Sequence, residues 1–236
     1  MTEKIEKMII LEVKEYAEVE NAALVTALTD HGILTLIASG IFKPTSKNRP
    51  NLLPGSISEI EYFPTRLKNK VARLKKANII VEPDYENAFF GKIFIDKAIK
   101  FLKHFPNPYP PIYNAYVECL KHQKEGKSVY LLTYLVANGL GYFGIQPNIE
   151  TCVECGSPGN LCDFELYYGG YLCGNHIKNN KRRWTKELKC YYYIFKNLNT
   201  YLNICIPEVN EKIYRELISY YIDNGIYVDW ENLKKH

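Results

Sequence analysis

The stretch AALVTALTDHGILTLIASGI, residues 22–41, holds two short apolar runs that are separated by a turn-forming Asp-His-Gly sequence. Comparable runs lie before it at residues 5–13 and after it at residues 57–63. All of them are rich in β-branched or apolar residues and are bounded by turn signals, which favours strands. Several short strands at this spacing are typical of a small β-barrel or a curled sheet. We therefore expect residues 1–80 to form an all-β domain.

The pattern changes after Pro83, where apolar residues begin to recur at helical spacing and glycine and proline residues mark the ends of the runs. The helical runs are residues 88–105, 112–143, 185–199 and 210–225. We expect residues 81–236 to form a mainly helical domain, so the whole chain belongs to the α+β class.

The composition is that of an ordinary globular protein, because 236 residues with 47% hydrophobic content can bury a sizeable core. No run approaches the ~20 apolar residues that span a membrane, and the first 18 residues are too charged for a signal peptide. These features predict a cytoplasmic protein. The chain has seven cysteines, an odd number, and nothing in the sequence indicates secretion. A disulfide framework is therefore not expected.

Four side chains of the types that bind metal ions lie in two close pairs within CVECGSPGNLCDFELYYGGYLCGNH, residues 152–176. Cys152 and Cys155 form the first pair, Cys173 and His176 form the second, and seventeen residues lie between the pairs. This spacing is typical of a tetrahedral zinc site, because each pair supplies two ligands from one turn. A Gly-Gly turn before the second pair would return the chain to the metal. We predict a zinc ribbon over residues 150–178, inserted in the helical domain.

The predicted zinc has a structural role, because four protein ligands leave no open position for a substrate or a water. Its binding energy would fold a segment that is too short to form its own core. Cys162 leaves one alternative open, since it could replace His176 as the fourth ligand or lie beside the site.

Basic residues are unevenly distributed along the chain, although the formal net charge is only +4. Residues 41–80 contain nine Lys or Arg against two Glu, and a second basic cluster precedes Trp184. The predicted DNA-binding residues are Lys43, Lys47, Arg49, Arg66, Lys68, Lys70, Arg73, Lys75 and Lys76 in the first group and Lys178, Lys181, Arg182 and Arg183 in the second. Basic loops on a small barrel suit a nucleic-acid backbone, because phosphate contacts release counterions and give affinity with little dependence on sequence. Phe42 is a candidate platform for stacking bases.

An enzymatic function is not expected, since the sequence contains neither a Walker loop nor a dinucleotide fingerprint. The acidic residues Glu82, Asp84 and Glu86 surround a proline and are better explained as a solvated domain junction. A protein-binding adaptor that uses exposed helices around the YYYIF sequence remains the alternative to DNA binding.

Four segments together resemble the bacterial RecO family of recombination and repair mediators, and the resemblance covers nearly the whole chain. They are EKIEKMIILEVKEYAEVE at 3–20, LTDHGILTLIASGIFKPTSKN at 28–48, LLPG at 52–55, and CVECG at 152–156 leading to YYGGYLCGNH at 167–176. Two positions depart from the family pattern. His176 stands where many relatives have cysteine, and Gly55 stands where an aromatic residue is expected after Leu-Pro.

The resemblance implies an N-terminal OB-fold followed by a helical domain that carries the zinc ribbon. It also implies binding to single- and double-stranded DNA and annealing of complementary strands. The partners that it implies are RecR, single-strand-binding protein and, indirectly, RecA, which such proteins help to load on coated DNA. No membrane association is implied.

Overall fold

The computed structural model describes residues 3–65, 71–87, 90–178 and 183–228. The chain divides into two compact units, residues 1–126 and residues 127–236. Within the described ranges, no helix combines the length and the apolar character needed to cross a membrane.

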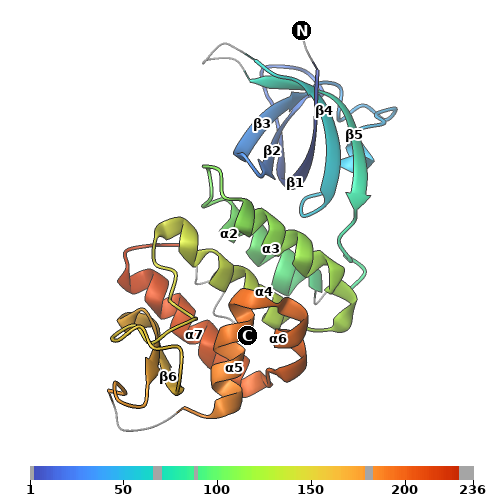
Figure 1. The fold of residues 1–236 in the computed structure, drawn as a ribbon. Coiled ribbons are helices and arrows are strands. Elements are labelled where there is room, and N and C mark those ends of the chain that lie inside the picture. The colour runs from blue at the N-terminus through green and yellow to red at the C-terminus, as the bar shows by residue number, and fades with distance from the viewer. Residues whose placement is uncertain (1–2, 66–70, 88–89, 179–182, 229–236) are drawn as a thin grey trace. The chain divides into compact units, whose positions relative to one another are not determined.

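Five strands of the first unit form a closed barrel in the order β1-β2-β3-β5-β4 (Figure 1). They are β1 (Lys4–Glu15), β2 (Ala23–Thr29), β3 (Gly32–Ala38), β4 (Ile57–Phe63) and β5 (Ala72–Val81). Strands β3 and β5 are parallel, and the other neighbours are antiparallel. This is an OB-like barrel, so the predicted α+β class with an N-terminal barrel is confirmed.

The barrel interior is filled by aliphatic side chains that alternate along the strands. Met8 and Ile10 on β1 and Val25 and Ala27 on β2 are fully buried and belong to one hydrophobic cluster with Ile60 on β4. Alternation of this kind places every second residue inside the barrel, as expected for strands with period two. Four of the five strands agree with the apolar runs of the sequence, whereas β5 was not predicted.

The connection between β3 and β4 lies along the free edge of β5. Strands β3 and β5 pair at Leu36–Ala72 and Ile37–Arg73, and beyond these residues two asparagines take over. The Asn48 side-chain oxygen accepts a hydrogen bond from the Ala77 amide at 3.0 Å, and its side-chain nitrogen donates one to the Lys75 carbonyl at 3.3 Å.

Asn51 extends the same pattern. Its side-chain oxygen accepts a hydrogen bond from the Ile79 amide at 3.0 Å, and its side-chain nitrogen donates one to the Lys47 carbonyl at 2.9 Å. It lies in η1 (Arg49–Asn51), a single turn of 3-10 helix. The two asparagines thus replace a neighbouring strand at the edge of β5 and fix the β3–β4 connection to it.

Gly55 ends this connection in a conformation that a larger residue would strain. Its φ is +82°, and a Cβ atom would lie 2.7 Å from the Ile95 side chain. The Gly55 carbonyl accepts a hydrogen bond from the Tyr116 hydroxyl at 2.7 Å, and its amide donates to the Ile10 carbonyl. A glycine is therefore required at this position by both backbone angle and space.

Helical elements complete the first unit after β5. They are η2 (Gly91–Ile95), a π-helical turn that continues into α2 (Asp96–Leu102), then α3 (Pro110–Lys121) and η3 (Gln123–Glu125). Aromatic rings form much of their core, because Phe90, Phe94 and Tyr116 are fully buried and pack in sequence with centroid separations of 5.1 and 5.8 Å.

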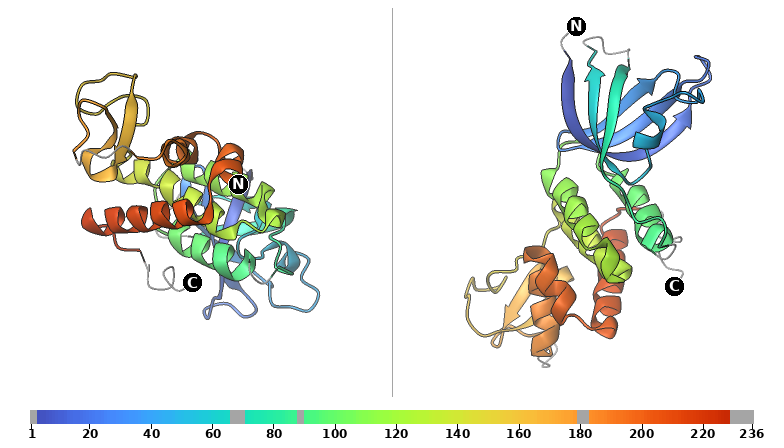
Figure 2. Two further views of the ribbon diagram at one scale, coloured as in Figure 1. Left: turned by 90° about the horizontal axis from the view of Figure 1, so that it is seen from below. Right: turned by 90° about the vertical axis from the view of Figure 1, so that its right-hand side faces the viewer.

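The second unit consists of helices and a two-stranded hairpin. The helices are α4 (Ser128–Asn138), η4 (Leu140–Phe143), α5 (Thr185–Lys196), α6 (Leu198–Ile204) and α7 (Pro207–Asp223). The hairpin is formed by β6 (Leu161–Glu165) and β7 (Gly170–Cys173), joined through η5 (Leu166–Tyr168), and β6 packs on α5 (Figure 2). The predicted helical domain with an inserted ribbon is therefore found. The predicted domain boundary at residue 81 remains a prediction. The compact units of the structure divide at residue 126, so the first unit includes the barrel and the helices up to η3.

Replacing Asn51 by Ala should release the β3–β4 connection from β5, because the Ile79 amide loses its acceptor. We expect the free energy of unfolding to fall by about 1–3 kcal/mol. Amide hydrogen exchange followed by NMR should show faster exchange at Ile79. The matched variant Asn48→Ala should instead accelerate exchange at Ala77, and equal protection of both amides in both variants would contradict the docking described above.

Candidate metal centre and nucleic-acid interface

The four predicted metal ligands converge in the second unit. The ligand atoms of Cys152, Cys155, Cys173 and His176 all lie within 4.8 Å of one another. The His176 Nδ1 atom is 3.2 Å from the Cys173 sulfur and 3.6 Å from the Cys152 sulfur, and the sulfurs of Cys155 and Cys173 are 3.9 Å apart. Tetrahedral zinc with the usual bond lengths separates its ligands by roughly 3.3–3.8 Å. The cluster therefore has the dimensions needed to hold a metal ion.

The backbone of the hairpin brings the two ligand pairs together. The Val153 amide donates to the Tyr171 carbonyl at 2.9 Å, which ties the first pair to β7. Gly170 packs against the chain just before the first pair, and a Cβ there would lie 2.0 Å from the Asn148 carbonyl oxygen. Few apolar side chains support this arrangement, since Leu172 is the one fully buried aliphatic residue in the local cluster. A metal ion would supply the missing stability.

The pKa values of two neighbouring thiols in the cluster are shifted in opposite directions. Burial raises the pKa of Cys152, but backbone amides of Cys173, Cys155 and Glu154 outweigh this effect and lower the pKa to about 6. The Ser157 amide favours the thiolate of Cys155, yet burial and the neighbouring sulfurs of Cys152 and Cys173 raise its pKa overall. Sulfurs that compete for negative charge in this way are suited to a shared cation.

Cys162 lies on β6 and is buried. It is not among the four described residues whose ligand atoms converge. The geometry therefore favours His176 as the fourth ligand over the alternative that the sequence left open.

Arg183 occupies the centre of a group of carboxylates in the second unit. Its guanidinium lies 3.0 Å from Asp163 and Glu165, 2.7 Å from Glu187 and 3.3 Å from Glu216, and its side chain is 12% exposed. The carboxylates come from β6, α5 and α7, so one cation ties the hairpin to two helices. A guanidinium that is largely buried and already paired with four acids has its charge balanced and offers little to a phosphate. This arrangement argues against the prediction that Arg183 contacts DNA.

Two basic runs that are separate in the sequence become neighbours on the barrel. Because Asn48 is bonded to β5, Lys47 and Arg49 lie beside the exposed Lys76 of that strand. Among the predicted DNA-binding residues of the barrel that the structure describes, those that are exposed and form no ion pair with a described residue are Lys43, Lys47, Arg49, Arg73 and Lys76. We call these five residues the barrel basic edge.

The remaining predicted DNA-binding residues differ in their surroundings. Lys75 is paired with Glu3 at 2.8 Å and Glu61 at 2.6 Å, and Lys178 is paired with Glu154 at 2.8 Å. These are exposed pairs that a phosphate can replace at little cost. The predicted residues Arg66, Lys68, Lys70, Lys181 and Arg182 lie outside the described residues.

Phe42 does not have the surroundings expected of a base-stacking residue. Its ring packs against the hydrophobic cluster of the barrel. The residue also lines a cavity of about 480 Å³ with Glu15 and Glu20, whose negative charges repel phosphates. We assign Phe42 a packing role.

Sequence reasoning missed the residues that organise both sites. Asn48 and Asn51 bring Lys47 and Arg49 to β5, and four acids hold Arg183. Neither group has a sequence spacing that reveals its partners. The one available signal was the density of asparagine around a proline in SKNRPN, which indicates side-chain to backbone bonding without indicating to which strand.

The fold and the two sites define a protein with an OB-like barrel and a helical unit that carries a metal-binding hairpin. Comparison with protein-family models gives a match to "Recombination protein O N terminal" over residues 1–82 and to "Recombination protein O C terminal" over residues 84–232. The chain therefore belongs to the recombination protein O (RecO) family.

Similar curated proteins carry the name DNA repair protein RecO. The one from Mesoplasma florum is 27% identical over 225 residues, which cover 88% of this chain and 82% of that protein. The one from Bacillus subtilis is 24% identical over 241 residues, which cover 93% of this chain and 89% of that protein. The similarity extends over both compact units.

Mutation of the metal cluster should separate the two alternatives for the fourth ligand. We expect about one divalent metal ion per chain, and we expect Cys173→Ser and His176→Ala to lower this content strongly. Metal analysis after gel filtration provides the measurement. Cys162→Ser is the matched control and should retain the metal, so loss in Cys162→Ser together with retention in His176→Ala would overturn the assignment.

Removal of the central guanidinium should destabilise the second unit. Arg183→Met leaves four carboxylates without their shared cation, and we expect the free energy of unfolding to fall by about 3–5 kcal/mol. Both tryptophans of the chain lie within residues 127–236, so their fluorescence in urea reports on this unit. Arg215→Met is the control, because its pair with Glu211 is exposed and should be worth less than about 1 kcal/mol.

The cost of Arg183→Met should depend on pH in a defined direction. Burial raises the pKa of Glu187, but hydrogen bonds from Lys212 and Arg183 outweigh it and hold the pKa below its ordinary value. In the wild type this contribution is present above the unfolded carboxyl pKa of about 4.3 and is lost as the pH falls. The difference in stability between wild type and Arg183→Met should therefore shrink below about pH 4, and a difference that grows on acidification would contradict the network.

Proposed function

We propose that this RecO-family chain acts as a recombination mediator that binds single- and double-stranded DNA through the barrel basic edge and anneals complementary strands. Membership of a family of recombination and DNA repair proteins supports a role in recombinational repair. The observation that carries the proposal is the docking of Asn48 and Asn51 on β5, which places the exposed Lys47 and Arg49 beside the exposed Lys76 of that strand on an OB-like barrel.

The proposed mechanism is electrostatic and requires no catalytic residue. Two DNA strands repel each other through their phosphates, and cations that bind those phosphates reduce the repulsion. Contacts to the backbone leave the base edges free to pair. Lys47 and Arg49 are suited to this work, because the asparagine contacts fix their backbone while their side chains remain exposed.

We propose that zinc occupies the Cys/His cluster and has a structural role. Three thiols and one imidazole are ligands that zinc prefers, and all four tetrahedral positions would be filled by protein. Zinc bound there would hold the loop of Cys152 and Cys155 against β7. The residues of this cluster supply no group for chemistry on DNA.

The proposed partners follow from the family. We propose that the chain cooperates with RecR, contacts single-strand-binding protein and thereby helps RecA to load on coated single strands. Co-purification of the full chain with each of these proteins would test the proposal.

Charge reversal on the barrel basic edge tests the DNA-binding proposal. The triple variant Lys47→Glu, Arg49→Glu, Lys76→Glu should weaken single-strand binding by at least about tenfold and reduce the salt slope by about 2, since each lost phosphate contact contributes roughly 0.7. Fluorescence anisotropy of a labelled oligonucleotide across a salt series provides both values, and annealing rates should fall in parallel.

Lys14→Glu is a matched control for the barrel, because Lys14 is exposed on β1, whose neighbours are β2 and β4. It should change the affinity by less than about twofold. Wild-type protein that is folded and loaded with metal but does not bind DNA at low salt would refute the proposal, as would an unchanged salt slope in the triple variant.

A further inference from the structure

The exposed face of α5 carries lysines and tyrosines in a regular pattern. Lys186, Lys189, Tyr193 and Lys196 follow one another at intervals of three and four residues, and Tyr192 lies beside them. This spacing places all five side chains on one side of the helix. The opposite side is buried in the second unit through Cys190, Tyr191 and Ile194 and their neighbours. We call the five residues the α5 face.

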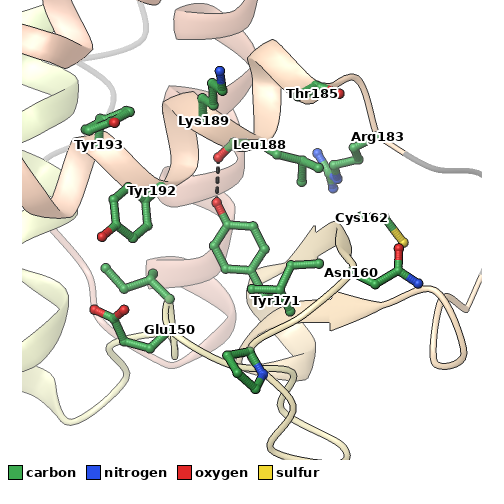
Figure 3. Close-up of a pocket in the computed structure, with 13 residues that line it drawn as sticks. Glu150, Asn160, Cys162, Tyr171, Arg183, Thr185, Leu188, Lys189, Tyr192 and Tyr193 are labelled. Carbon is green, nitrogen blue, oxygen red and sulfur yellow. Dashed lines mark hydrogen bonds between the residues drawn. The ribbon is translucent and has the colours of Figure 1, made fainter.

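A cavity of about 620 Å³ lies between the α5 face and the metal-binding hairpin. Figure 3 shows Tyr192 and Tyr193 at one end of it, Arg183 and Cys162 at the other, and Tyr171 between them. The Tyr171 hydroxyl donates to the Leu188 carbonyl, which fixes this ring as part of the wall. A cavity of this size lies within the range of about 300–1,000 Å³ that is typical of ligand sites.

The cations of the α5 face are available to an anion. Neither Lys186 nor Lys189 forms an ion pair with any residue that the structure describes, and the Lys186 ammonium lies 5.4 Å from the centre of the Trp184 ring. Trp184 itself is 51% exposed. Glu150 is the carboxylate that lines the cavity, and its charge is balanced by Lys196.

The aromatic rings are presented to the same surface. Tyr192 and Tyr193 pack edge to face with centroids 5.2 Å apart, so their ring faces point in different directions. The Lys196 ammonium lies 6.0 Å from the Tyr192 ring. Aromatic faces that alternate with lysines are the arrangement that binds unpaired bases and their phosphates together.

We infer that the α5 face and its cavity form a second binding site for single-stranded DNA, separate in sequence from the barrel basic edge, in which Tyr192 and Tyr193 stack on bases and Lys186 and Lys189 bind phosphates. The inference rests on the proposed function, because it assigns a further contact to the same ligand. A duplex would satisfy the lysines but would keep its bases inside the helix. The site therefore selects unpaired strands.

Photo-crosslinking with the full-length, metal-loaded protein tests the contact directly. An oligo-dT strand that contains 5-iododeoxyuridine should crosslink to a peptide that includes residues 185–196, in addition to any peptide from the barrel. Competition with unlabelled single strands should remove the crosslink, and competition with duplex should not.

Affinity measurements give an independent test. Tyr192→Ala and Tyr193→Ala should each weaken single-strand binding by about 5-fold or more and leave duplex affinity within twofold. Tyr192→Phe and Tyr193→Phe keep the ring and should bind like the wild type. Lys189→Glu should weaken binding and lower the salt slope, whereas Arg215→Glu on the exposed side of α7 is the control for charge. Circular dichroism and metal content verify that each variant is folded.

The outcomes distinguish this inference from the proposed function. Wild-type protein that binds no DNA refutes both. DNA binding that depends on the barrel basic edge, with no crosslink in residues 185–196 and unchanged affinity in the tyrosine variants, refutes the second site alone. An equal loss of duplex and single-strand affinity refutes base stacking. Binding of an acidic peptide to the α5 face without any crosslink to DNA would identify the surface as a protein-docking site and likewise overturn the inference.

Discussion

The edge of β5 imposes the constraint on which the DNA-binding proposal depends. Strand β3 pairs with β5 at Leu36–Ala72 and Ile37–Arg73, and the amides further along β5 need other acceptors. Buried or half-buried amides without partners are costly. Asn48 and Asn51 meet this need, and in doing so they place the basic residues around them beside those of the strand. A requirement of backbone hydrogen bonding thus determines where positive charge gathers on the barrel.

The second unit follows a different principle, because side chains of opposite charge and clustered metal-ligand types connect its segments in addition to the buried Phe164, Tyr171 and Leu172 of the hairpin. Two groups of such side chains can be distinguished. The Cys/His cluster joins the loop before β6 to β7, and Arg183 joins β6 to α5 and α7 through Asp163, Glu187 and Glu216. Because both groups act on the same hairpin, loss of either one should loosen the wall of the cavity beside the α5 face.

The sequence was most informative where local pattern decides the structure. Short apolar runs bounded by turn signals predicted four strands, helical spacing predicted the helices that follow the barrel, and the paired ligand spacing predicted which four side chains converge. It failed where partners are distant in the chain. The adjacent lysines of β5 obscured its alternation, Arg183 looked like one more surface cation, and Phe42 looked exposed because it stands beside Lys43. In each case the deciding contact comes from another segment, and no residue pattern nearby encodes it.

Gly55 brings together two segments that are far apart in the chain. It stands where the resemblance led us to expect an aromatic residue, and in this structure the space for a side chain is occupied by Ile95. A relative with a large residue at this position must therefore have a smaller one at the position of Ile95, or a different path of the backbone between them. We expect positions 55 and 95 to vary together among RecO proteins. The space between them would be filled by a side chain from one position or from the other.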